Sequence, residues 1–549
     1  MNATRESKEL HALTSLRFFA AMMIVALHLS GNFPMIARVS SGLFLFQGVS
    51  FFFILSGFIL FYSYQRFDSI KEVLFFWSKR IARLWPLHMV TMFLSILVLP
   101  SALIMAGPVP TWIVAIANVS LLHAWIPHRQ FYLSLNSPSW SISTELFFYL
   151  SLPALILLFR KSRVGLFALV SGLWFSTLAL GNTITDDASF GNAHAAFGLA
   201  YINPACRLLE FTIGLYLADV YLRLDDRLRI GRNWASFLEL LVLALLIVAI
   251  AFTAPVSNAL SPFVGAAGKH WMNTVGVTVV PFSLLILFSA FQRGALTQFL
   301  SKRLLVFLGE ISFAVYMVHA PLIKLWERVV PLPESQPLEI TLLVVFLAIL
   351  LALSHILYTA VEIPSKTAIT SFTRSLILGD KKISRTLVFP PVVDMLRRNR
   401  VIIAEISLLL LIFSTYQSTD TCKTSISRVS MGSVQQACLE DLMRESIQWE
   451  MGKAKSGEVA SYLYTLKNRI RISGLVDSHQ KEVLDKISAQ YLILSSKHLP
   501  NSRWNQVYLE VRDGQQAPYR LSKLTDWEFV DFIYRSARSV AGKSGESWQ

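Results

Sequence analysis

An arginine and a histidine occupy the first apolar stretch of the chain, "LTSLRFFAAMMIVALHLS" at residues 13–30. Ionisable side chains are costly at membrane depth, so Arg17 and His28 need a function that offsets their cost. They are eleven positions apart, which places both on one face of a helix, about 16 Å apart along its axis. Neutral imidazole can accept a proton or act as a nucleophile, and guanidinium can bind an anion. Taken singly, Arg17 could instead be an interfacial anchor and His28 a hydrogen-bond partner of another helix.

Polar side chains recur in the later apolar stretches. The segment "NSPSWSISTELFFYL" at 136–150 brings hydroxyl groups and a carboxylate to the end of one span. Arg207 and Glu210 are spaced i, i+3 and can pair on one helix, which would make them structural. The full set is Ser139, Trp140, Ser143, Glu145, Arg207, Glu210, Tyr316, His319 and Glu362. Ionisable groups on several spans predict a polar cavity rather than separate anchors.

Two further arginines lie in "FWSKRIARLWP" at 76–86. Arg80 and Arg83 are about one helical turn apart, and we expect them on a cytoplasmic loop just before the third span. Adjacent guanidinium groups can grip phosphates bidentately. The spacing alone fits equally well the basic charge that marks cytoplasmic loops.

The elements that must position these residues follow from composition. Of the 549 residues, 54% are hydrophobic and 15% are charged, a balance typical of a membrane protein rather than a soluble one. The net charge of +15 lies mostly in short loops between apolar stretches, which indicates membrane orientation and argues against a nucleic-acid partner. Three cysteines exclude a disulfide scaffold or a thiolate metal cluster, and we expect no metal.

The sequence predicts an all-α polytopic bundle with ten spans, an eleventh span and a small, mostly helical tail. The stretch 111–126 is short and flanked by prolines, so it reads as a re-entrant or interfacial segment. The expected domains are a core at 1–365, a basic linker at 366–400, the eleventh span at 401–417 and a tail at 418–549. The ten core spans are expected near 12–31, 43–63, 87–106, 144–160, 164–181, 204–222, 234–253, 273–292, 304–323 and 338–361.

Basic loops fix the expected direction of the spans. With a cytoplasmic N-terminus every short loop obeys the positive-inside rule, and the loop at 181–203, which has no Lys or Arg, falls outside. The tail would then lie outside too, and Cys422 and Cys438 could form a disulfide in that oxidising compartment. We expect an integral protein of a bacterial cytoplasmic (inner) membrane.

Taken together and in order, these stretches resemble the acyltransferase-3 family over residues 8–365. Arg17 and His28 match its Arg-ten residues-His motif, "KRIARLWP" its Arg-x-x-Arg loop, and "PSWSISTELFFYL" its Trp-Ser-x-x-x-Glu segment. "GVSFFFILSGFIL", "CRLLEFTIGLYLA", "LGEISFAVYMVHAPL" and "VEIPSK" resemble four more of its segments. Each motif is weak alone, but seven in the same order on compatible spans make a specific signature.

The resemblance implies transfer of an acyl group, most often acetyl, from cytoplasmic acyl-CoA to a carbohydrate or lipid-linked glycan acceptor outside. Arg80 and Arg83 would hold CoA phosphates with help from Arg17. His28 would be the general base or the covalent acyl carrier, a choice that the sequence leaves open, and Glu145 would orient His28 or the acceptor hydroxyl. The remaining polar groups would shape and neutralise the cavity.

Two points of the sequence qualify the resemblance. Many long family members carry an SGNH-type domain after an eleventh span, but this tail lacks the Gly-Asp-Ser motif near its start. Direct transfer by the core is then the simpler reading, with the tail recognising the acceptor or a partner such as a glycan-assembly protein. The alternative is a transporter of a polysaccharide precursor or acyl group without transferase chemistry, which ten spans and a polar cavity would also suit.

Overall fold

Helices form every regular element among the residues that the structure describes. The computed structural model describes residues 9–378 except 99–109, 184–194, 226, 228–229, 331–332 and 334. These residues all belong to one of the two units into which the chain divides. The expected eleventh span, the tail and its two cysteines lie outside the described residues, so those domain predictions remain predictions.

Eight helical segments in the described part are long and apolar enough to cross a membrane. A ninth is the bent pair α15 (Arg303–Glu310) and α16 (Ser312–Val329), whose axes differ by 56°. Helix α10 (Pro204–Leu224) has 21 residues but carries Arg207 and Glu210 and is mostly buried. The chain is thus an all-α polytopic membrane bundle. The eight segments are α1 (His11–Leu29), η1–α3 (Leu45–Ser63), α4 (Ile70–Val98), η4–α7 (Ser137–Lys161), α8 (Arg163–Thr183), α11 (Arg232–Ala251), α12–α13 (Thr253–Phe291) and α17–α18 (Gln336–Ile377).

Helix α4 begins well before the third span expected from the sequence. It runs unbroken from Ile70 to Val98 and includes Pro86, so Arg80 and Arg83 lie inside a helix and not on a loop. The reason is local: Lys, Glu and Arg are good helix formers, and a membrane helix tolerates an internal proline. The expectation of a loop here was therefore wrong.

Two other connections matter for the site. The stretch expected to be re-entrant or interfacial folds as α5 (Thr111–Val119), η3 (His123–Trp125) and α6 (Arg129–Tyr132), none of which is long enough to span a bilayer. The stretch between the expected spans at 234–253 and 273–292 is helix α12 (Thr253–Trp271), which is kinked at Gly265. Gly265 has φ +73°, a left-handed conformation that glycine adopts without a Cβ clash.

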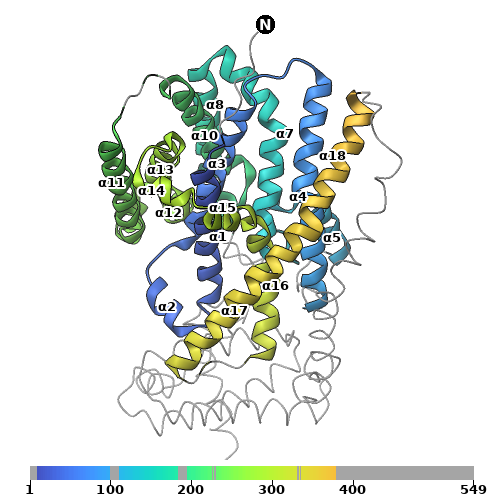
Figure 1. Cartoon of the computed structure of the whole chain (residues 1–549), viewed down its shortest axis with the longest axis vertical. Coiled ribbons are helices and arrows are strands. Elements are labelled where there is room, and N and C mark those ends of the chain that lie inside the picture. Colours follow the sequence, from blue (N-terminus) through green and yellow to red (C-terminus); the bar gives the residue numbers. More distant parts are fainter. Residues whose placement is uncertain are drawn as a thin grey trace, which may run out of the picture. The chain divides into compact units, whose positions relative to one another are not determined.

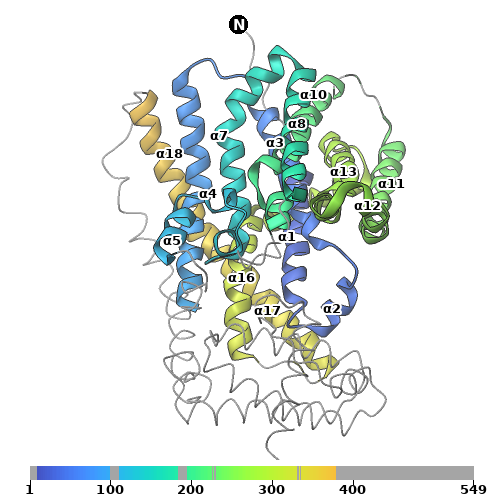
Figure 2. The same ribbon diagram turned by 180° about the vertical axis from the view of Figure 1, so that it is seen from behind.

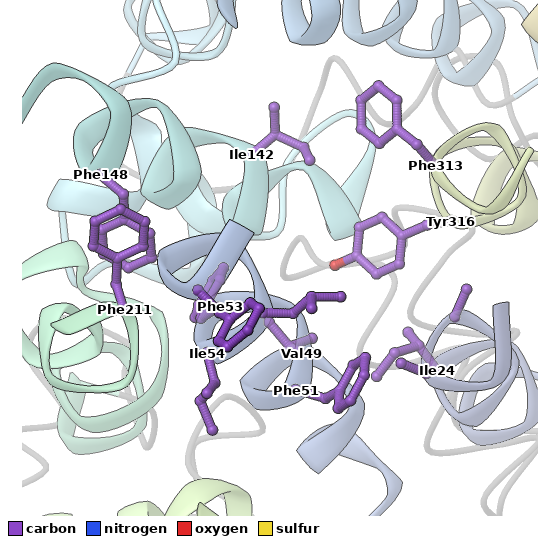
Figure 3. Close-up of a cluster of buried hydrophobic side chains, with 14 of the residues drawn as sticks. Ile24, Val49, Phe51, Phe53, Ile54, Ile142, Phe148, Phe211, Phe313 and Tyr316 are labelled. Atoms are coloured by element: carbon purple, nitrogen blue, oxygen red, sulfur yellow. The ribbon is translucent and has the colours of Figure 1, made fainter. Parts of the chain in front are cut away.

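Helices α3 (Gly48–Ser63) and α10 cross closely at the centre of the bundle. A Cβ on Gly57 would collide with the Phe211 carbonyl oxygen, and a Cβ on Gly214 would collide with that of Ile54. Small residues allow such a close approach of two membrane helices. Around the crossing, Phe53, Phe148 and Phe211 join residues of α1 and α16 in one buried apolar cluster (Figure 3).

Helix α17 (Gln336–Leu357) continues through a π-helical turn, η8 (Tyr358–Glu362), into α18 (Ile363–Leu378). In both views α18 lies beside α4, with α7 (Trp140–Lys161) on the other side of α4 (Figures 1 and 2). Two more π-helical turns are η6 (Gly198–Ile202) and η7 (Met272–Gly276). Such turns are rare and often occur at functional sites.

Candidate active site

Two histidines from distant parts of the chain meet within the bundle. The C-terminal turn of α1 carries His28, and α16 carries His319, which is fully buried. His28 Nδ1 lies 2.8 Å from His319 Nε2, and the two rings stack with 11° between their planes. One ring must donate and the other accept, so this bond fixes the orientation of both imidazoles. It also leaves Nε2 of His28 as the nitrogen available for chemistry.

A hydrogen-bonded frame holds α16 against the start of α7. The Tyr316 hydroxyl accepts a hydrogen bond from Ser141 at 2.8 Å and donates to the Pro138 carbonyl at 3.1 Å. Asn136 donates to the Met317 carbonyl at 2.9 Å, and the Tyr316 ring centroid is 5.8 Å from that of His319. The sequence flagged Tyr316, but Asn136 was missed, although it opens the same polar segment.

Other residues of that segment hold η4 and α7 against the stretch around η3 and against η6. Ser139 Oγ lies 3.2 Å from Nε2 of His123, and Ser143 donates to the Leu121 carbonyl at 2.5 Å. The Trp140 ring packs against Tyr201 with centroids 4.8 Å apart. All three predicted residues are buried and contact protein groups, so the structure places them in a supporting frame.

A second set of charged residues gathers where α1, α4, α7 and η8 meet. Arg17 interacts electrostatically with Arg83, Glu362 and Glu145, and Arg83 also interacts with both carboxylates. Within the described part of the chain, neither arginine side chain has a hydrogen bond or an ion pair within 4 Å. Two guanidinium groups thus share one region of the interior without a bound partner.

The partners of Glu145 differ from those that the sequence suggested. Its carboxylate accepts a hydrogen bond from the Tyr149 hydroxyl and one from Ser56 at 3.4 Å, and it belongs to the Arg17–Arg83 set. His28 has His319 as its partner instead. Glu145 lies more than one turn into α7, within reach of α3 and Arg83, and its other expected role, orienting the acceptor hydroxyl, stays a prediction. Glu362 is buried, and its Oε2 has no hydrogen bond within the described residues.

Arg80 lies one turn from Arg83 toward the start of α4. Its Nη2 donates to the Tyr64 hydroxyl at 3.5 Å, and its guanidinium lies 5.8 Å from the Tyr149 ring centroid. The neighbouring Lys79 donates to the same Tyr64 hydroxyl at 2.7 Å. Sequence reasoning missed Lys79 and Tyr64, because nothing in the spacing shows that the end of α3 meets α4 here.

Arg207 and Glu210 form a fully buried ion pair of 2.8 Å on α10. Arg207 also donates to Ser50 at 3.0 Å, and its guanidinium lies 4.9 Å from the ring centroids of both Phe53 and Tyr201. Ser50 in turn donates to the Thr274 carbonyl in η7 at 3.0 Å. The pair therefore ties α10 to α3 and to the π-helical turns η6 and η7.

The fold and these buried groups define a polytopic membrane protein with polar chemistry inside its helical bundle. A family model described as an acyltransferase domain matches residues 10–359. The chain belongs to this acyltransferase-3 family, which confirms the resemblance inferred from its motifs. It is accordingly an integral membrane acyltransferase.

Several curated proteins are similar to this chain. It is 31% identical to the acyltransferase MdmB of Streptomyces mycarofaciens over 58% of this chain and 80% of that one. It is 26% identical to the putative peptidoglycan O-acetyltransferase YrhL of Bacillus subtilis, over 68% and 58% of the two chains. For the O-acetyltransferase OatA of Staphylococcus aureus the identity is 25%, over 57% and 50%. The match thus spans only 58% and 50% of the last two relatives, and no solved structure matches the chain.

Proposed function

We propose that this protein transfers an acyl group, most simply acetyl, from cytoplasmic acyl-CoA to a hydroxyl of a cell-envelope or exported polysaccharide. Membership of the family establishes the acyltransferase activity. Two similar proteins are named O-acetyltransferases, one of them for peptidoglycan, which supports an acetyl donor and a glycan acceptor. The residues that would bind the CoA phosphates and react with the acyl group are inferred from the structure.

The observation that carries the donor assignment is the excess of cations where α1, α4, α7 and η8 meet. Among the described residues, Arg17, Arg80, Arg83 and Lys366 belong to one electrostatic set, in which the carboxylates that act directly on these cations are Glu145 and Glu362. In the described part of the chain this set has two more cations than carboxylates, and Arg17 and Arg83 have no hydrogen-bond partner there. Cations held without partners inside a bundle fit an anionic ligand such as the pyrophosphate of CoA.

The spacing of Arg17 and His28 supports the same donor. The eleven-residue step along α1 corresponds to about 16 Å. The pantetheine arm has about twelve bonds between pyrophosphate and sulfur, which is as many as four extended residues and reaches roughly 14 Å. A CoA thioester with its pyrophosphate at Arg17 and Arg83 would therefore bring its carbonyl carbon near His28.

Two routes for His28 start from the same nitrogen. As a general base, Nε2 takes the proton of the acceptor hydroxyl while that oxygen attacks the thioester carbonyl, the carbon–sulfur bond breaks and the CoA thiolate leaves. As a nucleophile, Nε2 attacks the carbonyl itself, expels the thiolate and then passes the acyl group to the hydroxyl. In either route the His319 bond holds the ring in place, as a third group does in other nucleophile–base systems.

We infer the direction of transfer from the basic loops, which by the positive-inside rule favour a cytoplasmic N-terminus and a tail outside a bacterial inner membrane. A Ser544→Cys variant should react with a membrane-impermeant thiol reagent added to intact spheroplasts. Labelling that requires permeabilised membranes would reverse the orientation and place the acceptor on the wrong side.

Transfer itself can be tested in proteoliposomes that contain the purified full-length protein. Labelled acetyl-CoA on the cytoplasmic face should give labelled glycan on the other face, with free CoA released in equal amount. Mass spectrometry of surface glycans from cells with and without the chain would then identify the acceptor. Movement of acetyl label or glycan across the membrane without a new ester would show a transporter and contradict the proposal.

A further inference from the structure

Lys79 and Arg80 on α4 both direct a side-chain nitrogen at one oxygen atom. Lys79 Nζ donates to Tyr64 Oη at 2.7 Å, and Arg80 Nη2 donates to the same atom at 3.5 Å. Tyr64 follows the last turn of α3, and its ring is held by Phe67 and Phe76, with centroids 5.7 and 4.9 Å away. Two cations that converge on one oxygen have the arrangement that binds a phosphate oxygen.

These two cations lack the carboxylate partners that some other basic residues of the protein have. Some Arg and Lys side chains in the described part, such as Arg163 and Lys324, form ion pairs with Asp or Glu. Lys79 and Arg80 have no carboxylate within 4 Å among the described residues. The Tyr64 pKa reflects these two positive charges. Burial raises this pKa, but the hydrogen bond from Lys79 and the charge of Arg80 together lower it by more, so the pKa lies below its ordinary value.

We propose that Lys79, Arg80 and Tyr64, which we name the α4 clamp, bind the 3′-phosphate of the donor CoA. This inference rests on the proposed function. The 3′-phosphate and the pyrophosphate of CoA flank one ribose ring, and the clamp is separated from Arg83 by about one helical turn, or roughly 5 Å of rise. With the pyrophosphate at Arg17 and Arg83, the nucleotide end points toward the start of α4, where the clamp lies.

In this arrangement the residues of the clamp have distinct parts. Lys79 supplies a point charge used only by the 3′-phosphate, whereas Arg80 can reach both phosphate groups with its fork of donors. Tyr64 gathers the two cations when no ligand is bound, and a phosphate oxygen takes its place as their acceptor. The clamp would make the protein distinguish CoA from dephospho-CoA, which lacks only this phosphate.

The test measures binding of CoA and dephospho-CoA to the purified full-length protein in nanodiscs of neutral lipid. The parent should bind CoA roughly ten- to a hundredfold more tightly, the range of a hydrogen bond between charged groups. Lys79→Gln should bring CoA down to the affinity of dephospho-CoA and leave dephospho-CoA unchanged. Tyr64→Phe should weaken the preference less. Lys71→Gln is the matched control, because this exposed lysine lies on the same helix, and it should behave as the parent.

The contrary results separate the clamp from the proposed function. If the parent binds neither ligand, the proposed CoA donor fails and the clamp with it. If the parent binds both ligands equally well, or Lys79→Gln weakens both by the same factor, only the clamp assignment is overturned. An anionic lipid headgroup offers the same chemistry, so binding is repeated in anionic nanodiscs. Suppose that anionic lipid competes with CoA in the parent, and that Lys79→Gln abolishes this competition but keeps the preference for CoA over dephospho-CoA. The clamp would then bind lipid, and the proposal would be overturned.

Discussion

Arg207 and Arg83 are both guanidinium groups inside the helical bundle, but their surroundings differ. Arg207 is fully buried, paired with Glu210 at 2.8 Å and placed between two aromatic rings at 4.9 Å. Arg83 has charged groups nearby but no hydrogen bond or close ion pair with any residue of the described ranges. Arg207 has a carboxylate partner and a serine partner at Nη2, although its Nε and Nη1 have no hydrogen bond among the described residues, whereas Arg83 has neither an ion pair nor a hydrogen bond there.

The contrast separates structural charges from functional ones, which motif matching cannot do. Both sets belong to segments that resemble family motifs, and both use arginine on a membrane helix. We call Arg207 and Glu210 the closed set, and Arg17, Arg80 and Arg83 the open set. Removal of a charge from the closed set should therefore lower the stability of the fold. Removal of a charge from the open set should act on ligand binding and leave the fold intact.

The largest expected effect is on the closed set. Arg207→Ala leaves the Glu210 carboxylate buried without its partner, which costs about 3–5 kcal/mol of the free energy of unfolding. Thermal unfolding of the detergent-solubilised protein measures the loss. The double variant Arg207→Met with Glu210→Leu removes both charges and should be much closer to the parent. If Arg207→Ala unfolds at the same temperature as the parent, the comparison fails, because the ion pair then does not stabilise the fold.

The open set should respond in the opposite way. Arg80→Ala combined with Arg83→Ala should weaken acyl-CoA binding by at least tenfold, since a charged hydrogen bond contributes about 1.5–3 kcal/mol, with little change in thermal unfolding. Lysine at both positions should restore acyl-CoA binding only poorly, because an ammonium group lacks the two parallel donors of a guanidinium group. Arg160→Ala, a change at an exposed arginine on α7, is the control. Unchanged acyl-CoA binding in the double alanine variant would reduce Arg80 and Arg83 to markers of topology.

A smaller effect is expected at the histidine pair. His319→Ala removes the hydrogen bond that orients His28 and should lower kcat about tenfold with little change in KM, the value of one hydrogen bond. His319→Gln keeps a polar atom near the position of Nε2 and should recover part of kcat. Equal loss in both variants, or a parent-like His319→Ala, would exclude a positioning role.

The membrane fold and most polar residues of the site could be predicted from the sequence, because hydrocarbon makes ionisable residues conspicuous. Arg17, His28 and Glu362 stand out in this way. Their pairing could not be predicted, since it depends on how helices rotate against one another. His28 meets His319 from 291 positions away, while Glu145 is bound by Tyr149 and Ser56. The expected start of the third span was wrong for a related reason. Pro86 and the charged residues before it suggested that a helix begins there, but α4 begins at Ile70 and continues through them.

The most direct measurement of the central claim is acyl transfer by His28→Ala, made together with thermal unfolding of the same sample. Loss of a general base lowers the rate by about 10²–10⁴-fold, and loss of a covalent acyl carrier should lower it further. His355→Ala, at an exposed histidine of α17, controls for loss of an imidazole elsewhere. The account predicts that His28→Ala is inactive, binds acyl-CoA and unfolds as the parent does. Parent-like transfer by this variant, or inactivity accompanied by collapsed stability, would contradict it.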